Sequence, residues 1–309
     1  MDDGKLNGII VIDKPPDITS ARVVASIKKS LNAAKVGHAG TLDPFAEGVL
    51  ICCINQATRL AGFLLHGPKK YTAVLKLGEE TDTQDSTGTV IAGSNPDGLS
   101  RQTIQNVIKS FKGTLEQLPP VYSALKHKGV PLYRLARRGQ PVQKPPRRVH
   151  IYDINVKQID LPFICFEVAC SAGTYIRALG SDIAKSLGCG GHLCELKRVE
   201  SSGFTLDQAT PLSEVEELAR AQKLNRRIIS MKDALPAMPE FYATEHLVDK
   251  IQHGQVLTVQ ELIDRQGIKG VGEPYIKIVD RKGNLIAILE HRASLDRLKY
   301  CCVFAKPHN

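Results

Sequence analysis

Short apolar runs rich in β-branched residues alternate along this chain with segments of helical periodicity, and this alternation restricts the fold more than any other feature. Residues 8–12 and 49–54 are continuous apolar runs typical of buried strands, and residues 71–77 alternate between apolar and polar. Ser20 is a candidate N-cap for a helix that reaches Leu31. Further strands are predicted at residues 88–92, 148–158 and 163–170, and further helices at residues 57–65, 100–111 and 174–187. We therefore expect an α+β fold built on a mixed sheet.

A domain boundary is predicted near residues 236–239, where two prolines follow a charged, helical stretch over residues 212–235. The chain has 309 residues, which is longer than one average domain. Beyond the prolines, residues 275–279, 285–289 and 300–305 read as short strands separated by turns. We expect a larger domain over residues 1–240 and a small β-rich module over residues 241–309.

The eight cysteines fit neither a disulfide framework nor a zinc site. The pairs at residues 52–53 and 301–302 lie in strand-like runs, where neighbours point to opposite faces, so all four are predicted to be core residues. Cys189, His192 and Cys194 are potential ligands, but no second cluster completes a four-coordinate site, so we expect no metal. The first apolar run is too short for a signal or membrane segment. We expect a reduced, cytoplasmic protein.

Basic residues are in excess, with 41 Lys and Arg against 32 Asp and Glu and a net charge of +9. Eight of them lie in one span that contains no acidic residue: Lys126, Lys128, Arg134, Arg137, Arg138, Lys144, Arg147 and Arg148. Proline and glycine interrupt the span, so we predict a loop, a short helix around residues 132–138 and another loop. Such a segment can follow a phosphate backbone, and the alternative is a solvated basic face.

The loop over residues 37–44, with the sequence GHAGTLDP, presents one carboxylate, Asp43, shortly before the apolar run at residues 49–54. Its glycines allow close approaches that a side chain forbids, and Pro44 favours an extended Asp43. That geometry suits a nucleophile or a general base. It suits equally well an N-cap of a helix with Pro44 in its first turn, and the spacing leaves both interpretations open.

This loop resembles the G-H-x-G-x-L-D-P catalytic motif of the TruB family of tRNA pseudouridine synthases. Other blocks follow in the family's order. NGIIVIDKP, residues 7–15, resembles its opening strand and Lys-Pro turn, and KKY, residues 69–71, resembles the strand that carries its active-site tyrosine. GTYIR, residues 173–177, is similar to the segment with its arginine, and LGCGGHLCELKR, residues 187–198, to the turn and strand that follow.

The resemblance implies a role for particular side chains. Asp43 would be the nucleophile, and Arg177 would keep it ionised and oriented. Tyr71 would lie against the target uracil, Tyr175 would contact the substrate, Leu196 would close the apolar side of the pocket, and His38 would fill the space that extruded bases leave. The alternative for each is an ordinary structural role, such as a core tyrosine or leucine or a surface arginine.

The implied reaction is the isomerisation of a uridine in the T-arm loop of tRNA, at position 55, to pseudouridine, after the base leaves its stack. Substrate and product are isomers, so no cofactor is expected. The segment over residues 121–126 resembles the stand-alone bacterial type, which implies tRNA as the partner without a guide RNA or a membrane, and we expect a monomer. The C-terminal strands resemble a PUA-type RNA-binding domain.

Several questions stay open at this point. Asp43 could attack the uracil ring or ribose C1′, or act through elimination to a glycal-like intermediate. The acidic run over residues 79–85 is predicted to be structural, because its charge does not suit contact with RNA. Two competing functions are a noncatalytic RNA-binding protein and an aspartate-dependent hydrolase. A hydrolase would require a second carboxylate or a metal cluster near Asp43. Only Glu47 is close in sequence, and no set of metal ligands accompanies it.

Overall fold

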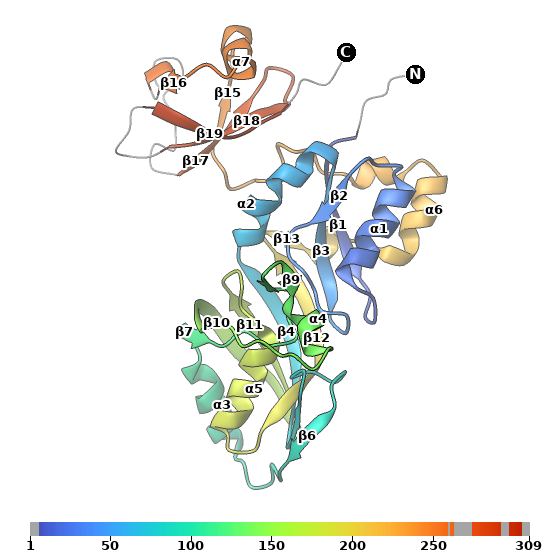
Figure 1. Cartoon of the computed structure of the whole chain (residues 1–309), viewed down its shortest axis with the longest axis vertical. Coiled ribbons are helices and arrows are strands. Elements are labelled where there is room, and N and C mark those ends of the chain that lie inside the picture. The colour runs from blue at the N-terminus through green and yellow to red at the C-terminus, as the bar shows by residue number, and fades with distance from the viewer. Residues whose placement is uncertain (1–5, 259, 263–273, 292–296, 305–309) are drawn as a thin grey trace.

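The main sheet is long and mixed, and its order brings distant segments together (Figure 1). The computed structural model describes residues 6–258, 260–262, 274–291 and 297–304. In this part of the chain the sheet consists of β1 (Gly8–Lys14), β2 (Val36–His38), β3 (Glu47–Ile54), β4 (Lys69–Leu77), β7 (Gly113–Gln117), β10 (Arg147–Asp160), β11 (Phe163–Cys170), β12 (Gly191–Ser201), β13 (Phe204–Thr205) and β14 (Thr210–Pro211). The order is β14-β1-β3-β12-β4-β11-β10-β7, with β2 beside β3 and β13 beside β12. Two pairs, β1 with β14 and β3 with β12, are parallel, so the predicted α+β class with a mixed sheet is confirmed.

Three helices cover one face of this sheet: α1 (Ser20–Ser30), α3 (Arg101–Ser110) and α5 (Ile176–Ser186). Their buried residues recur at helical spacing, such as Ile104 and Ile108 of α3. Ser100 caps α3 by accepting a hydrogen bond from the amide of Thr103. On the opposite face, a 3-10 turn over Asn55–Leu60 and α2 (Ala61–His66) replace the single helix predicted at residues 57–65.

The strands β1 and β3 are buried on both faces, which explains their unbroken apolar sequences. Ile10 and Ile12 pack against the helices, whereas Ile9 and Val11 point to the opposite core. Cys52 and Cys53 divide in the same way, as predicted.

A second sheet begins after the two prolines. It contains β15 (Glu240–Tyr242), β16 (Leu257–Thr258), β17 (Tyr275–Val279), β18 (Leu285–Glu290) and β19 (Arg297–Val303), in the order β15-β17-β18-β19-β16, with α7 (Glu245–Gln252) beside it. Part of this module forms its own core, but Leu285, Ile288 and Phe304 join the apolar cluster of Leu60 and Leu64. The module therefore shares an apolar cluster with the larger domain, and Figure 1 shows it at the α2 end of that domain.

Two predictions for this half of the chain were wrong. Cys301 is exposed, because β19 has one solvated face and alternates with the buried Leu298 and Cys302. The stretch over residues 212–235 contains only one short helix, α6 (Val215–Arg220), between 3-10 turns, because the chain reverses at Gln222 with φ of 56°. The predicted strand at residues 300–305 ends at Val303, and Ala305 lies outside the described residues, as do residues 1–5.

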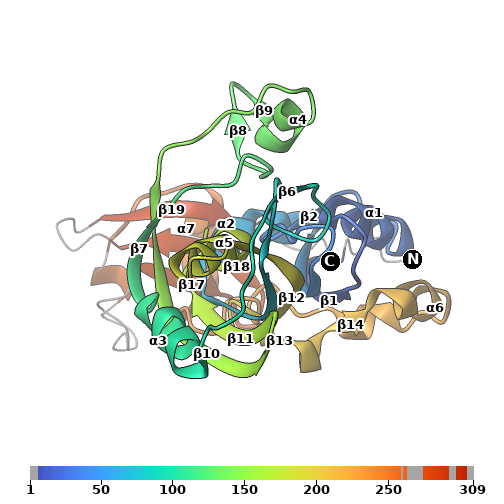
Figure 2. The same cartoon turned by 90° about the horizontal axis from the view of Figure 1, so that it is seen from below.

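Two hairpins extend from the main sheet. One joins β5 (Glu79–Thr81) to β6 (Val90–Gly93), close to the hairpin partner predicted at residues 88–92. The other opens residues 121–146, which we call the arm, and pairs β8 (Lys126–His127) with β9 (Val130–Pro131) ahead of α4 (Leu132–Ala136). The short helix was predicted and the hairpin was not. Figure 2 shows the arm standing away from the body. No helix in the described residues is long and apolar enough to cross a membrane.

Candidate active site

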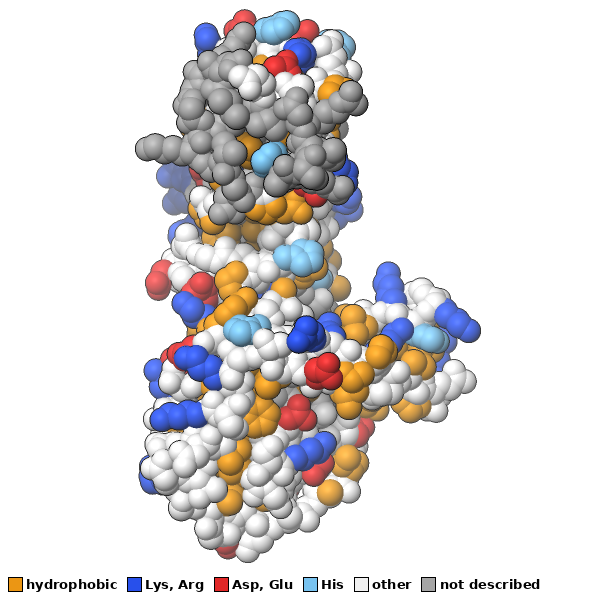
Figure 3. Space-filling view, turned by 90° about the vertical axis from the view of Figure 1, so that its left-hand side faces the viewer, with side chains coloured by type: hydrophobic (Ala, Val, Ile, Leu, Met, Phe, Trp, Pro, Cys, Tyr) orange, Lys and Arg blue, Asp and Glu red, His pale blue; other side chains and the backbone are white. Residues whose placement is uncertain are grey.

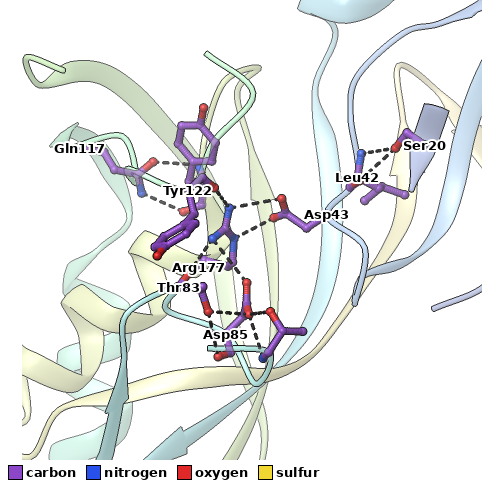
Figure 4. Close-up of polar contacts among 10 residues, drawn as sticks. Ser20, Leu42, Asp43, Thr83, Asp85, Gln117, Tyr122 and Arg177 are labelled. Atoms are coloured by element: carbon purple, nitrogen blue, oxygen red, sulfur yellow. Dashed lines mark hydrogen bonds and ion pairs between the residues drawn. The ribbon is translucent and has the colours of Figure 1, made fainter. Parts of the chain in front are cut away.

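The loop between β2 and β3 is fixed to the body by buried side chains on either side of Asp43. The hydroxyl of Ser20 donates to the carbonyl of Leu42 at 3.0 Å and accepts from its amide at 2.9 Å (Figure 4). The ammonium of Lys14 donates to the carbonyl of Pro44 at 3.1 Å. Arg198 donates to the carbonyl of Gly40 at 3.0 Å. These contacts hold the backbone of the loop, so the position of Asp43 is set before any ligand arrives.

The structure excludes a helix cap at two positions where the sequence suggested one. No helix follows Asp43: the chain turns through Phe45 and enters β3, so the N-cap interpretation is wrong. Ser20 does not cap α1 either, because the hydroxyl of Thr19 accepts from the amide of Arg22 and performs that task. Both residue types are suitable caps. Because Thr19 caps the helix, the hydroxyl of Ser20 is available to bind the backbone of Leu42.

Asp43 and Arg177 form a two-point ion pair. The Nε of Arg177 donates to Oδ2 of Asp43 at 2.8 Å, and Nη2 donates to Oδ1 at 3.2 Å (Figure 4). Arg177 is 2% exposed, whereas the side chain of Asp43 keeps 32% of its surface open. A buried guanidinium therefore orients a carboxylate that a ligand can still reach.

The remaining donors of Arg177 connect the pair to two other segments. Nη1 donates to the carbonyl of Thr83 at 2.6 Å and lies 3.4 Å from Oδ2 of Asp85, and Nη2 donates to the carbonyl of Tyr122 at 2.8 Å. Asp85 is buried, and its Oδ1 accepts from the hydroxyls of Thr83 and Thr87. Within the acidic run that was predicted to be structural, Asp85 supports the arginine of the site, which its sequence position did not indicate.

A cavity of about 400 Å³ opens in front of Asp43. Tyr71, Tyr175 and Leu196 line it, so the structure brings together all three of these predicted site residues with Asp43. Leu65 and His66 of α2 form part of its wall, and Ala124 and Leu125 at the base of the arm form another. The cavity thus lies between the body and the arm, where Figure 3 shows the arm projecting from the surface.

Tyr71 lies directly across the β4–β12 pairing from Arg198. Burial raises the pKa of the Tyr71 phenol, and the guanidinium of Arg198 acts against that rise. Arg198 is itself buried and donates to the carbonyl of Val49 at 2.7 Å. A side chain on Gly48, which has φ of 101°, would collide with the backbone of Arg198, so this glycine permits the close approach.

Two lysines of this region are also buried. Burial lowers the pKa of Lys14 to about 8, although nearby carboxylates, Asp17 and Asp43, oppose the change. Burial likewise lowers the pKa of Lys69 to about 8, and Arg198 contributes to the lowering. Both ammonium groups donate to backbone carbonyls, which compensates for their removal from water.

Other predicted residues lie outside the cavity. His38 is on β2, where burial lowers the pKa of its imidazole, and it does not line the cavity wall. Lys126, Lys128, Arg137 and Arg138 are exposed on the arm, and Arg148 is exposed on β10. Arg147 alone of the predicted basic residues reaches the cavity, with its guanidinium 4.5 Å from the centre of the Tyr175 ring.

The described residues contain no group of three or more His, Cys, Asp or Glu side chains that could hold a metal ion. Cys194 and His192 are neighbours, with Sγ 4.0 Å from Nε2. Nδ1 of His192 is 2.8 Å from the carbonyl of Glu79, so a backbone contact accounts for this buried ring.

Sequence reasoning missed Lys14, Ser20, Asp85 and Arg198 as components of the site. Lys14 and Arg198 fall within the blocks that carried the family resemblance, which is the one signal that marked them. Ser20 and Asp85 carried no such signal, because a hydroxyl beside a helix start and an acid in a polar turn are common.

Comparison with known proteins agrees with this geometry. The model of the TruB family pseudouridylate synthase N-terminal domain matches residues 28–176, and that of the tRNA pseudouridylate synthase B C-terminal domain matches residues 177–236. The tRNA pseudouridine synthase B of Geobacter sulfurreducens is 43% identical over 249 residues, which are 81% of this chain and 82% of the relative. Its counterpart in Syntrophotalea carbinolica is 41% identical over 84% of both chains.

Solved structures give the same result. A chain in the crystal structure of a Cbf5-Nop10-Gar1 complex is similar with a TM-score of 0.71 and 30% identity, over 93% of this chain and 79% of the other. A chain of an H/ACA RNP bound to a substrate RNA containing 2′-deoxyuridine has a TM-score of 0.70 and 28% identity, over 93% and 78%. On these matches the chain belongs to the TruB family of pseudouridine synthases.

Proposed function

We propose that this enzyme isomerises the uridine at position 55, in the T-arm loop of tRNA, to pseudouridine, with Asp43 as the nucleophile. The observation that carries the proposal is the two-point pair of Asp43 with the buried Arg177, set in the wall of a cavity that Tyr71 and Leu196 also line. A nearby guanidinium favours the ionised carboxylate, which is the reactive form. The names of the relatives, tRNA pseudouridine synthase B, support tRNA as the substrate.

The reaction breaks the bond between N1 and ribose C1′ and forms a bond between C5 and C1′. A proton leaves C5 and N1 gains one, so the atoms balance without a co-reactant or a cofactor. Asp43 starts the cleavage, whether by adding to the ring, adding to C1′ or promoting elimination. Tyr71 stacks on the uracil and Leu196 encloses it, which keeps the detached base in place while it turns.

The substrate base must leave its stack to reach Asp43. In the proposal the exposed cations of the arm and of β10 follow the RNA backbone, and His38 occupies space that the extruded bases leave. Residues 241–309 act as a PUA-like RNA-binding module beside the catalytic domain over residues 1–240. In the proposal the enzyme works as a monomer without a guide RNA.

Specific contacts disfavour the two competing functions. A hydrolase needs a second carboxylate free to activate water, but Asp85 is buried against Thr83, Thr87 and Arg177, and Glu47 lies 3.4 Å from Lys197. A protein that only binds RNA does not need a buried arginine whose N–H groups orient one accessible carboxylate. Both observations favour a catalytic site.

The test is the conversion of an unmodified tRNA transcript. The incubated tRNA is treated with a carbodiimide that stays attached only to pseudouridine, because uridine and pseudouridine have the same mass. Nuclease digestion and mass spectrometry should then detect one labelled pseudouridine per tRNA, in the T-arm fragment. A transcript with cytidine at position 55 is the matched control and should gain none. Tight binding of the tRNA with no pseudouridine formed would favour the noncatalytic alternative, and pseudouridine in another fragment would refute the assignment of position 55.

A further inference from the structure

Arg147 differs from the other cations in the cavity wall, Lys69 and Arg198, and from Arg177 behind Asp43. The ammonium of Lys69 donates to the carbonyls of Leu65 and Gly67, and the guanidinium of Arg198 donates to the carbonyls of Val49 and Gly40. Arg177 is held by carboxylates and carbonyls. These three cations therefore already have acceptors in the folded chain.

Arg147 has no acceptor among the described residues. Its Nε is buried and lacks a hydrogen-bond partner, and its Cζ lies over the ring of Tyr175, 4.5 Å from the ring centre. A partly buried guanidinium without an anion or a carbonyl is costly, since water is partly excluded and nothing replaces it. A ligand that brings a negative charge into the cavity removes that cost.

The chain holds this guanidinium in place from three sides. Gln117, directly across the β7–β10 pairing from Arg147, accepts from the amide of Tyr175 at 2.8 Å and donates to its carbonyl at 3.0 Å. The Tyr175 ring then supports the guanidinium as a flat platform. On the third side is Gly173, with φ of 86°. Its lack of a side chain leaves room for the guanidinium, because a Cβ there would lie only 3.3 Å from Cζ of Arg147.

The anion must come from the same molecule that reaches Asp43, because both groups line one cavity. Uracil is neutral, so the negative groups available are the phosphates that join the target uridine to its neighbours. We propose that Arg147, stacked on Tyr175, binds a phosphate bonded directly to the target nucleotide. This inference rests on the proposed function and assigns to Arg147 a role distinct from that of the exposed cations.

Arg148 is the matched control, because it is the next residue of β10 and is exposed. Dissociation constants are measured for Asp43→Asn protein, which forms a complex without turnover, alone and with Arg147→Gln or Arg148→Gln. The RNAs are a T-arm stem-loop and two versions with a neutral methylphosphonate, one at the 5′ phosphate of the target uridine and one at its 3′ phosphate. With unmodified RNA, Arg147→Gln should weaken binding on the order of tenfold or more.

One of the two methylphosphonates should remove that effect, so that the protein with Arg147 intact and the Arg147→Gln variant bind the modified RNA equally. The Arg148→Gln effect should be the same on all three RNAs. If Arg147→Gln costs the same factor on both modified RNAs as on the unmodified one, the proposal is wrong. The RNA substitutions act on protein with Arg147 intact, so a loss of affinity there does not depend on how the variant folds. Pseudouridine formation by wild type on the unmodified stem-loop tests the proposed function separately.

Discussion

Replacing Arg177 by lysine keeps the charge of the site and removes its geometry. The guanidinium makes five close contacts from three nitrogens, with two oxygens of Asp43, one of Asp85 and the carbonyls of Thr83 and Tyr122. A lysine ammonium offers three donors from a single atom, so at least two of the five contacts are lost. Each buried acceptor that loses its partner costs about 1–3 kcal/mol, which gives roughly 2–6 kcal/mol in total.

Part of this cost destabilises the fold, and part of it frees Asp43 to rotate. A misplacement of the nucleophile of about 1 Å costs on the order of 100-fold in rate, so we expect kcat to fall by about that factor or more. The affinity for the stem-loop should change little, because the cations that follow the RNA backbone lie elsewhere.

The assay is single-turnover pseudouridine formation on saturating T-arm stem-loop, with filter binding run beside it. Arg101→Lys makes the same chemical change at an exposed residue of α3 and should leave both quantities unchanged. Turnover of Arg177→Lys within about threefold of wild type would refute the reasoning, because the fixed fork of donors would then be dispensable.

Three further perturbations test other parts of the site. Lys14→Met leaves three backbone carbonyls without their donor and should lower the free energy of unfolding by about 2–5 kcal/mol, measured by urea denaturation; an unchanged midpoint would contradict this. Ser20→Ala removes the hydrogen bonds to the carbonyl and the amide of Leu42 and should lower kcat more than the affinity for RNA. Equal losses of kcat and affinity would mean that Ser20 supports only the fold. Changing Arg137, Arg138 and Arg148 together to Gln should reduce the slope of log affinity against log salt by roughly 2–3, and an unchanged slope would identify them as a solvated face.

The parts of the fold that were predictable from sequence depend on local periodicity. The strands β1 and β3 have unbroken apolar sequences because both of their faces are covered. The N-cap of α3, Ser100, and its buried residues, Ile104 and Ile108, lie within nine residues of sequence. The prediction of a helical stretch over residues 212–235 was wrong because the local composition does not reveal where the helix ends. Its composition suits a helix, but a residue with positive φ, Gln222, ends α6 early.

The site was predictable only where family resemblance reached. Asp43, Tyr71 and Arg177 were correctly expected to share one location, although charge and spacing alone left Asp43 as a possible cap. Ser20 and Gln117 hold the site through backbone contacts with residues 22 and 58 positions away in the chain. A local sequence pattern cannot predict such contacts, because they depend on how the main sheet brings distant segments together.

Asp43→Asn tests the central claim most directly. The amide has nearly the shape of the carboxylate, and its oxygen can keep one of the two hydrogen bonds from Arg177, but it cannot act as the nucleophile. Wild-type protein should convert a short T-arm stem-loop in the presence of EDTA, and the variant should bind this RNA with similar affinity and form no pseudouridine over many wild-type half-lives. Turnover by the variant within tenfold of wild type, a difference of about 1.4 kcal/mol in the barrier, would contradict the assignment of Asp43 as the nucleophile.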